Sequence, residues 1–147
     1  MNTETGKVVS YFRTYSFIVT DSVELEAVYS ENVSAGVALN ITKAVTNAAT
    51  DTISFYSERS IKGYSLVENG IIVTNNATTA LSDEAFVIEG TDVLKAMSSS
   101  TASAGTFIAN KRNAGAGVEW FARAYAIVMN ADGEIITVYS AVKSAQI

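Results

Sequence analysis

The chain has 147 residues, of which 48% are hydrophobic and 17% charged, with a formal net charge of −5 and no cysteine, histidine or proline. The missing Cys and His exclude disulfides, thiolate nucleophiles, Ser-His-Asp triads and the usual zinc sites. The acidic balance and the lack of a basic cluster argue against a nucleic-acid partner, because affinity for phosphate comes from clustered Lys and Arg. We therefore expect a folded chain without a cofactor.

The first 32 residues contain three short runs with strand-like patterns, at residues 7–11, 15–20 and 22–29. In the third run Val23, Leu25, Ala27 and Tyr29 alternate with two glutamates and a valine, which is typical of a half-buried strand. Three short strands bury little surface by themselves, so this segment needs a neighbour to pack on. The sequence shows neither a signal peptide nor a long apolar run, and we expect no membrane insertion.

Residues 15–29 resemble the closing half of bacterial surface repeats of the internalin B-repeat type. Such repeats end in an aromatic residue, a Val-Thr turn and the pattern x-Leu-x-Ala-Val-Tyr; here these are Tyr15, Val19-Thr20 and residues 24–29. The resemblance implies that residues 1–32 are a partial β-rich surface repeat without its opening half. Residues 31–36 read as a short linker to the next segment.

Residues 36–147 alternate between apolar and polar residues in runs that predict about seven strands with turns at fairly regular spacing. The predicted strands are residues 37–42, 52–58, 64–74, 86–88 and 106–109, and the two arms of a hairpin within residues 118–143. This pattern favours an all-β, immunoglobulin-like sandwich. We also expect a helical turn at residues 91–97, capped by Thr91, and a flexible connection at residues 98–104. Gly70, inside a strand, predicts a bulge or a close backbone approach.

The hairpin has a strong turn signal at residues 130–133, Asn-Ala-Asp-Gly. One face of its first arm carries Trp120, three alanines and Val128. Both faces are rather apolar, which indicates a central strand with its second face partly covered, and the sequence leaves open which face holds the main core. The residues of the other face are Glu119, Phe121, Arg123, Tyr125 and Ile127.

Two stretches carry a second resemblance. Residues 63–70 read Gly-Tyr-Ser-Leu-Val-Glu-Asn-Gly, and the hairpin contains Ala-Arg-Ala-Tyr, Ala-Asp-Gly and Val-Tyr-Ser in that order. These motifs resemble those of Ig-like or fibronectin-type domains of Gram-positive cell-surface proteins. The resemblance covers most of residues 36–147. It implies an Ig-like domain in an extracellular, cell-surface context, with the signal and anchor outside this segment and neighbouring modules as partners.

The aromatic residues of the hairpin are candidates for ligand contact. Trp120, Phe121, Tyr125 and Tyr139 could form a platform for a sugar or a peptide, with Arg123 beside them. The alternative is that these rings fill the core and pair across strands. Arg123 is expected to stack between Phe121 and Tyr125. The platform requires at least two coplanar, exposed rings, so buried rings favour the alternative.

The acidic residues offer weaker candidates for chemistry. Glu68, Glu119 and Glu134 could pair for acid–base catalysis, but carboxylates at alternating strand positions more often form a solvated face. Asn130 and Asp132 match a calcium-binding loop only in part, since the flanking ligand positions lack acids, and a plain turn is favoured. Neither a catalytic residue nor a metal ligand is expected.

These patterns predict a non-enzymatic module of a bacterial cell-surface or secreted protein, acting as a spacer or display element. Weak recognition of a glycan or protein ligand could accompany that role, for example through strand addition at a sheet edge. The second hypothesis is a carbohydrate-binding or adhesin module that uses exposed aromatic residues. The third is a carboxylate-based hydrolase.

Overall fold

The computed structural model describes residues 36–147; the expectation of a partial surface repeat at residues 1–32 lies outside this part of the chain. The described residues contain eight strands and two single helical turns, neither of which is long or apolar enough to cross a membrane. In chain order the elements are β1 (Val37–Asn47), η2 (Ala48–Thr50), β2 (Thr52–Ile61), β3 (Ser65–Thr74), α1 (Ala77–Ala80), β4 (Leu94–Met97), β5 (Ala104–Arg112), β6 (Glu119–Met129), β7 (Ile135–Tyr139) and β8 (Lys143–Gln146).

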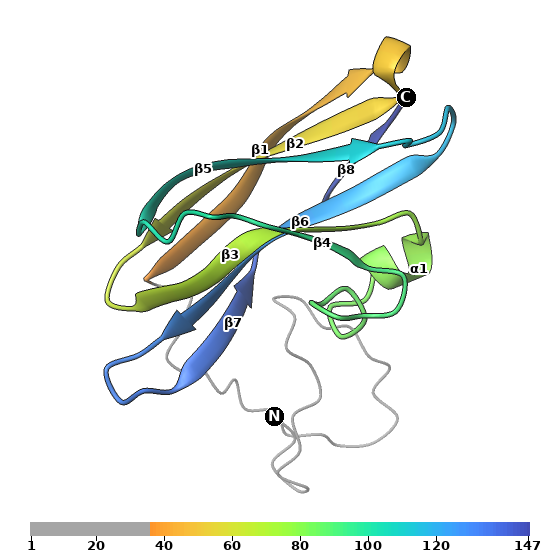
Figure 1. Ribbon diagram of the computed structural model, residues 1–147. Coiled ribbons are helices and arrows are strands. Elements are labelled where there is room, and N and C mark those ends of the chain that lie inside the picture. Colours follow the sequence, from red (N-terminus) through yellow and green to blue (C-terminus); the bar gives the residue numbers. More distant parts are fainter. Residues whose placement is uncertain (1–35) are drawn as a thin grey trace, which may run out of the picture. The chain divides into compact units, whose positions relative to one another are not determined.

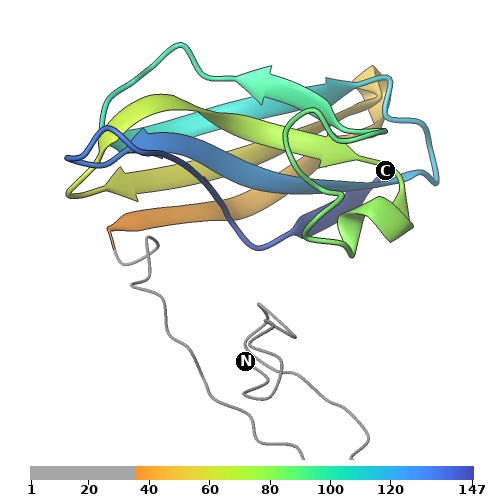
Figure 2. The ribbon, with the colours of Figure 1, turned by 90° about the horizontal axis from the view of Figure 1, so that it is seen from below.

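The strands form two antiparallel sheets packed face to face (Figures 1 and 2). One sheet has the order β1-β2-β5, and the other has the order β4-β3-β6-β7 with β8 also paired to β6. In the A-to-G scheme of immunoglobulin folds, β1, β2 and β5 take the places of A, B and E, and β3, β6 and β7 those of C, F and G. The predicted all-β sandwich is therefore confirmed.

The main core lies between the sheets, on the face of β6 that carries Trp120. Ile53 and Phe55 of β2 point inward, as their alternation predicted, and both are fully buried. The opposite residues on β6 are alanines, whose small side chains leave room for the large residues of the facing sheet. The largest cluster of this core consists of Ile41, Ile53, Phe55, Ile71, Val73, Ala109, Ala114, Trp120, Ala122 and Ala124.

The outer face of β6 is also covered, as its apolar character indicated. Residues 75–93, called here the covering segment, fold back over the outer face of β3 and β6 and include α1 (Figure 2). Phe86 of this segment packs with Ile72, Ala80 and Tyr125, and all four are buried. The strand predicted at residues 86–88 was wrong, because the apolar character of Phe86 reflects packing on a sheet rather than pairing within one.

A strand replaces the helical turn predicted at residues 91–97. Asp92 has a φ of 62°, a left-handed conformation that cannot begin a helix. The next residues instead pair as β4 with the edge of β3, from Val73 opposite Leu94 to Gly70 opposite Met97. Gly70 allows a close approach there, since an added Cβ would clash with the carbonyl oxygen of Ala96. The bulge in β3 lies elsewhere, at Val67.

The hairpin prediction holds for β6 and β7 but not for one continuous second arm. Asn130 closes the turn, since its side-chain oxygen accepts hydrogen bonds from the backbone N–H groups of Asp132 (3.0 Å) and Glu134 (2.8 Å). The second arm breaks after Tyr139, and β8 resumes pairing with β6 farther along. At the break, the Ser140 hydroxyl accepts the N–H of Ala124 at 2.8 Å, which replaces a strand-to-strand bond.

The connection at residues 98–103 is tied to the sheets, in contrast to the flexible stretch predicted. Buried Arg59 donates to the Ala102 carbonyl (2.8 Å) and to the Ser100 hydroxyl (3.1 Å). Buried Asn69 donates to the Ser100 carbonyl at 2.7 Å. Because buried polar groups need partners, these two side chains fix the course of a segment whose composition suggests a loose loop.

Candidate functional site

The structure divides the five predicted contact residues between the two faces of the second sheet. Trp120 faces the core and is only 8% exposed; its Nε1 donates to the Ala114 carbonyl at 2.8 Å, and the Lys111 ammonium lies 4.4 Å from its ring centroid. Trp120 therefore links the loop before β6 to the core, and its ring is buried there.

The other four residues, Phe121, Arg123, Tyr125 and Tyr139, lie on the outer face beneath the covering segment. Tyr125 is fully buried, and the Tyr139 hydroxyl accepts the backbone N–H of Ile88 at 3.0 Å. Their contacts are within the protein, with residues 75–93 and, for Arg123 and Tyr125, also with Ser140 and Glu68. Phe121 and Tyr139 are half-buried, so none of these three rings is fully exposed, which favours the alternative that they pack within the protein.

Arg123 is the centre of this contact and is only 7% exposed. Its Nη1 donates to the Phe86 carbonyl (3.0 Å) and lies 3.3 Å from Asp83 Oδ1, and its Nε donates to the Ser140 carbonyl (3.3 Å). Its Cζ lies 4.5 Å from the Tyr139 ring centroid, so the predicted stacking between Phe121 and Tyr125 was wrong. Burial lowers the pKa of the guanidinium, and Asp83 opposes that shift.

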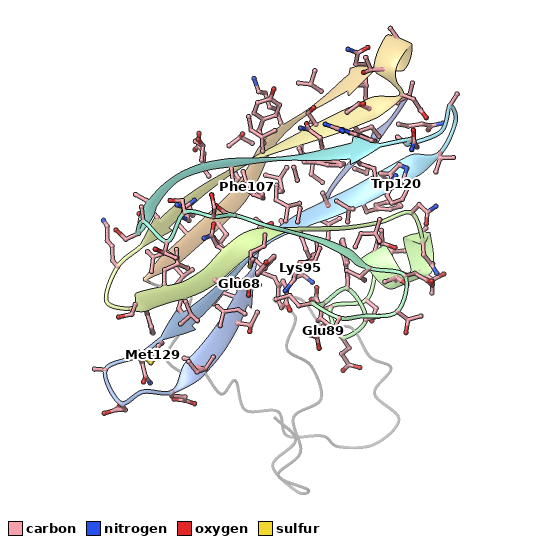
Figure 3. All side chains as sticks on the ribbon, viewed as in Figure 1. Glu68, Glu89, Lys95, Phe107, Trp120 and Met129 are labelled. Carbon is pink, nitrogen blue, oxygen red and sulfur yellow. The ribbon has the colours of Figure 1, made fainter. Side chains whose placement is uncertain are left out.

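A smaller polar group lies beside it, where Glu68 of β3 meets Lys95 of β4 (Figure 3). Glu68 Oε1 accepts a hydrogen bond from the Tyr125 hydroxyl at 2.8 Å and one from Lys95 at 3.1 Å. These hydrogen bonds, that of Tyr125 first, lower the pKa of Glu68. Burial and the hydrogen bond to Glu68 raise the pKa of Tyr125. A carboxylate with a lowered pKa is a stable ion, which suits an ion pair rather than a general acid.

This group predicts a pH dependence of stability. Because the folded-state pKa of Glu68 lies below its ordinary value of 4.5, its ionisation stabilises the fold above that pH, and the contribution is lost as the pH falls. We expect Glu68→Gln to unfold at lower urea concentration than the parent at neutral pH, with the difference shrinking toward about pH 3. Glu84→Gln, at an exposed position, controls for the loss of one charge. A difference that does not change with pH would contradict the assignment.

The remaining candidates for acid–base or metal chemistry are separated. Glu119 begins β6 and Glu134 follows the turn at its other end, and both are exposed. Asn130 uses its side-chain oxygen to close the turn, as described above. Within residues 36–147 no group of three or more potential ligand residues is placed to hold a metal ion.

Sequence reasoning missed one surface, which lies on the outer side of the first sheet at its Asn47 end. Its residues surround a shallow hollow of about 430 Å³. They occupy neighbouring positions because Asn47, Thr52 and Arg112 are cross-strand partners, as are Ser54 and Asn110. The available signal was the polar residue at every second position of β2. This surface, called here the polar face, consists of Asn47, Thr50, Thr52, Ser54, Asn110 and Arg112.

A second hollow, of about 410 Å³, lies where the edges of the two sheets meet. It runs between the first residues of β1 and the break after β7, and includes Leu39, Asn40 and Ser140. Its lining mixes apolar residues with Glu58 and Arg59, and the Ser140 hydroxyl is already engaged with Ala124 and Ala141.

Comparison of the chain with protein-family models, curated proteins and solved structures found no match.

Proposed function

We propose that residues 36–147 form a non-enzymatic, load-bearing spacer module of a bacterial cell-surface or secreted protein, with neighbouring modules as partners. The observation that carries this proposal is the position of the two ends of the sandwich. The chain enters the fold beside the turn between β2 and β3, where the Gly36 carbonyl accepts the N–H of Lys62. It leaves at the opposite end, where the Ile147 carbonyl accepts the N–H of Gly117 (Figure 1).

This arrangement places load along the strands. A force that separates residues 37 and 147 pulls β1 lengthwise past β2, and the two strands pair over nearly the whole of β1, from Val37 opposite Ile61 to Asn47 opposite Thr52. The hydrogen bonds between them are perpendicular to the strands and therefore resist together rather than one after another. At about 3.3 Å per residue, such a module adds roughly 35 Å of stiff length to a chain of modules.

The hydrogen bonds of the buried polar side chains support the same proposal. Within the described residues, each buried side-chain nitrogen or oxygen has a hydrogen-bond partner. The contacts of Arg59, Asn69 and Arg123 tie loops to sheets, which favours a rigid body. The chain has no His or Cys, and within residues 36–147 no group of three or more acidic side chains is placed to hold a metal ion. These features favour a spacer over an enzyme, and the sequence resemblance supports the extracellular location.

Force spectroscopy tests this role directly, and the absence of native cysteine allows single attachment points. Handles on Ala38→Cys and Gln146→Cys, both exposed, load the module along its strands. Handles on Thr50→Cys and Gln146→Cys attach at the same end and peel the sheet from there. We expect a clearly higher unfolding force in the first geometry, since forced unfolding reports the barrier along the loaded path. Equal forces, or a weaker first geometry, would reject the load-bearing role.

A further inference from the structure

The polar face has hydrogen-bonding groups that are not used in hydrogen bonds within residues 36–147, and most of them are donors. The Thr50 N–H donates to Asn47 Oδ1 at 3.3 Å, and the Ser54 hydroxyl donates to Asn110 Oδ1 at 2.7 Å. The side-chain oxygens of both asparagines are thereby occupied, while their NH₂ groups remain for another partner. Arg112, the third residue with several donors, has no side-chain hydrogen bond or ion pair within residues 36–147.

The charge of this surface is opposite to that of the whole chain. Arg112 and Lys43 are exposed on the outer side of the same sheet, and Lys43 lies 4.4 Å from the ring centroid of Tyr56. On the outer side of the sheet, the three cross-strand rows centred on Thr52, Ser54 and Tyr56 contain no acidic residue. Asp51, beside them, directs its Oδ1 to the N–H of Gly115 at 2.8 Å. The nearest acid on the outer side, Glu58, belongs to the next row.

The shape of the hollow in the polar face further restricts the kind of ligand that can bind. The hollow of about 430 Å³ is within the range of small-molecule sites, but it is open along the sheet and lined by short polar side chains and by Arg112. An open, donor-rich hollow suits a unit of an extended polymer with many oxygen acceptors. A carboxylate on that unit matches Arg112, whose guanidinium can donate two parallel hydrogen bonds. Tyr56 at the border supplies an apolar ring edge to a sugar.

We propose that the polar face is a binding site for an acidic polysaccharide, with Arg112 holding a carboxylate and Asn47, Asn110 and Thr50 binding ring or hydroxyl oxygens. This adds a recognition site to the proposed spacer and does not depend on it. It also differs from the aromatic platform predicted on the hairpin, since none of its residues belongs to β6 or β7. The site lies on the side of the sheet, so a module under load keeps it open.

Titration of the full chain with an oligogalacturonide, followed by amide chemical shifts, tests the site. We expect shifts at residues 47–54 and 110–112, and an affinity that falls as salt is added. The fully methyl-esterified oligomer has the same sugar backbone without the charge and should not bind measurably. Inorganic sulfate at equal ionic strength separates a saccharide site from a simple anion site, and competition by sulfate that abolishes all shifts would overturn the proposal.

The variants are chosen on exposed positions, so that the fold is retained. Arg112→Gln should weaken binding about tenfold or more, the equivalent of one charge-assisted pair. Asn110→Ala should weaken binding of the oligomer as well, without changing its salt dependence. Lys62→Gln removes one exposed positive charge at the opposite end of the sandwich and should bind as the parent does. Equal losses in Arg112→Gln and Lys62→Gln, or no binding by the parent, would reject the site. Neither result bears on the unfolding forces described above.

Discussion

Arg123→Met is expected to destabilise the fold by about 3–5 kcal/mol, because two carbonyl groups lose their hydrogen bonds to a buried, charged donor. Methionine fills a similar volume, so the loss is one of polar contacts. The Phe86 and Ser140 carbonyls lose their donor, and each hydrogen bond from a charged donor contributes about 1.5–3 kcal/mol. The stacking on Tyr139 is lost as well. Urea unfolding, followed by the fluorescence of Trp120, measures the change.

Two further variants separate the charge from the hydrogen bonds. Asp83→Asn removes the exposed acid of the ion pair, whose side chain is 61% exposed, and should cost less than about 1 kcal/mol. Arg123→Lys keeps the charge, but its single ammonium nitrogen cannot take the places of both Nη1, which binds Phe86, and Nε, which binds Ser140, so an intermediate loss of stability is expected. If Arg123→Met were as stable as the parent, the covering segment would be held by its apolar contacts alone.

Phe86→Ala is expected to have the second large effect, lowering the free energy of unfolding by about 3–5 kcal/mol. The Phe86 ring is fully buried against Ile72 and Tyr125, so its removal leaves a cavity on the outer side of the second sheet. The matched control is Leu81→Ala in the same segment, because Leu81 is 84% exposed and should change stability by less than about 0.5 kcal/mol.

Hydrogen exchange shows where the loss occurs. In Phe86→Ala we expect faster exchange of the amides of Ala80, Leu81 and Gly90, whose hydrogen bonds lie within the covering segment. The amides that join β1 and β2 should keep their protection, because the covering segment packs on the outer face of the other sheet. Faster exchange across both sheets would show instead that the segment and the sandwich unfold as one unit.

The period-two pattern predicted most strands correctly because it depends on one local property, the side of the sheet on which a residue lies. Ile53 and Phe55 were placed inward for this reason, and Asn130 and Gly133 marked their turn through local backbone chemistry. The wrong predictions fall where the character of a residue comes from tertiary packing and not from local secondary structure. Phe86 is apolar because it covers a sheet, and residues 94–97 are a strand because the edge of β3 was free to pair.

Binding residues were harder to place than strands. The aromatic residues of the hairpin have the composition of a contact surface, and the structure gives them contacts within the chain. Their partner, residues 75–93, lies far away in the sequence: Arg123 and Phe86 are 37 residues apart. The polar face was missed for the same reason, since Ser54 and Asn110 are 56 residues apart and meet only through the register of β2 and β5.

The sequence by itself determined the all-β class, the inward side of β2, the turn before β7 and the absence of cysteine and histidine chemistry. Each of these follows from composition or from neighbours a few positions apart. Only the tertiary structure decided that the core lies on the Trp120 side of β6, that Arg123 binds the covering segment, and that Asn47 and Arg112 share a surface. Those outcomes depend on strand order and register, which are set by the packing of distant segments and leave no local pattern.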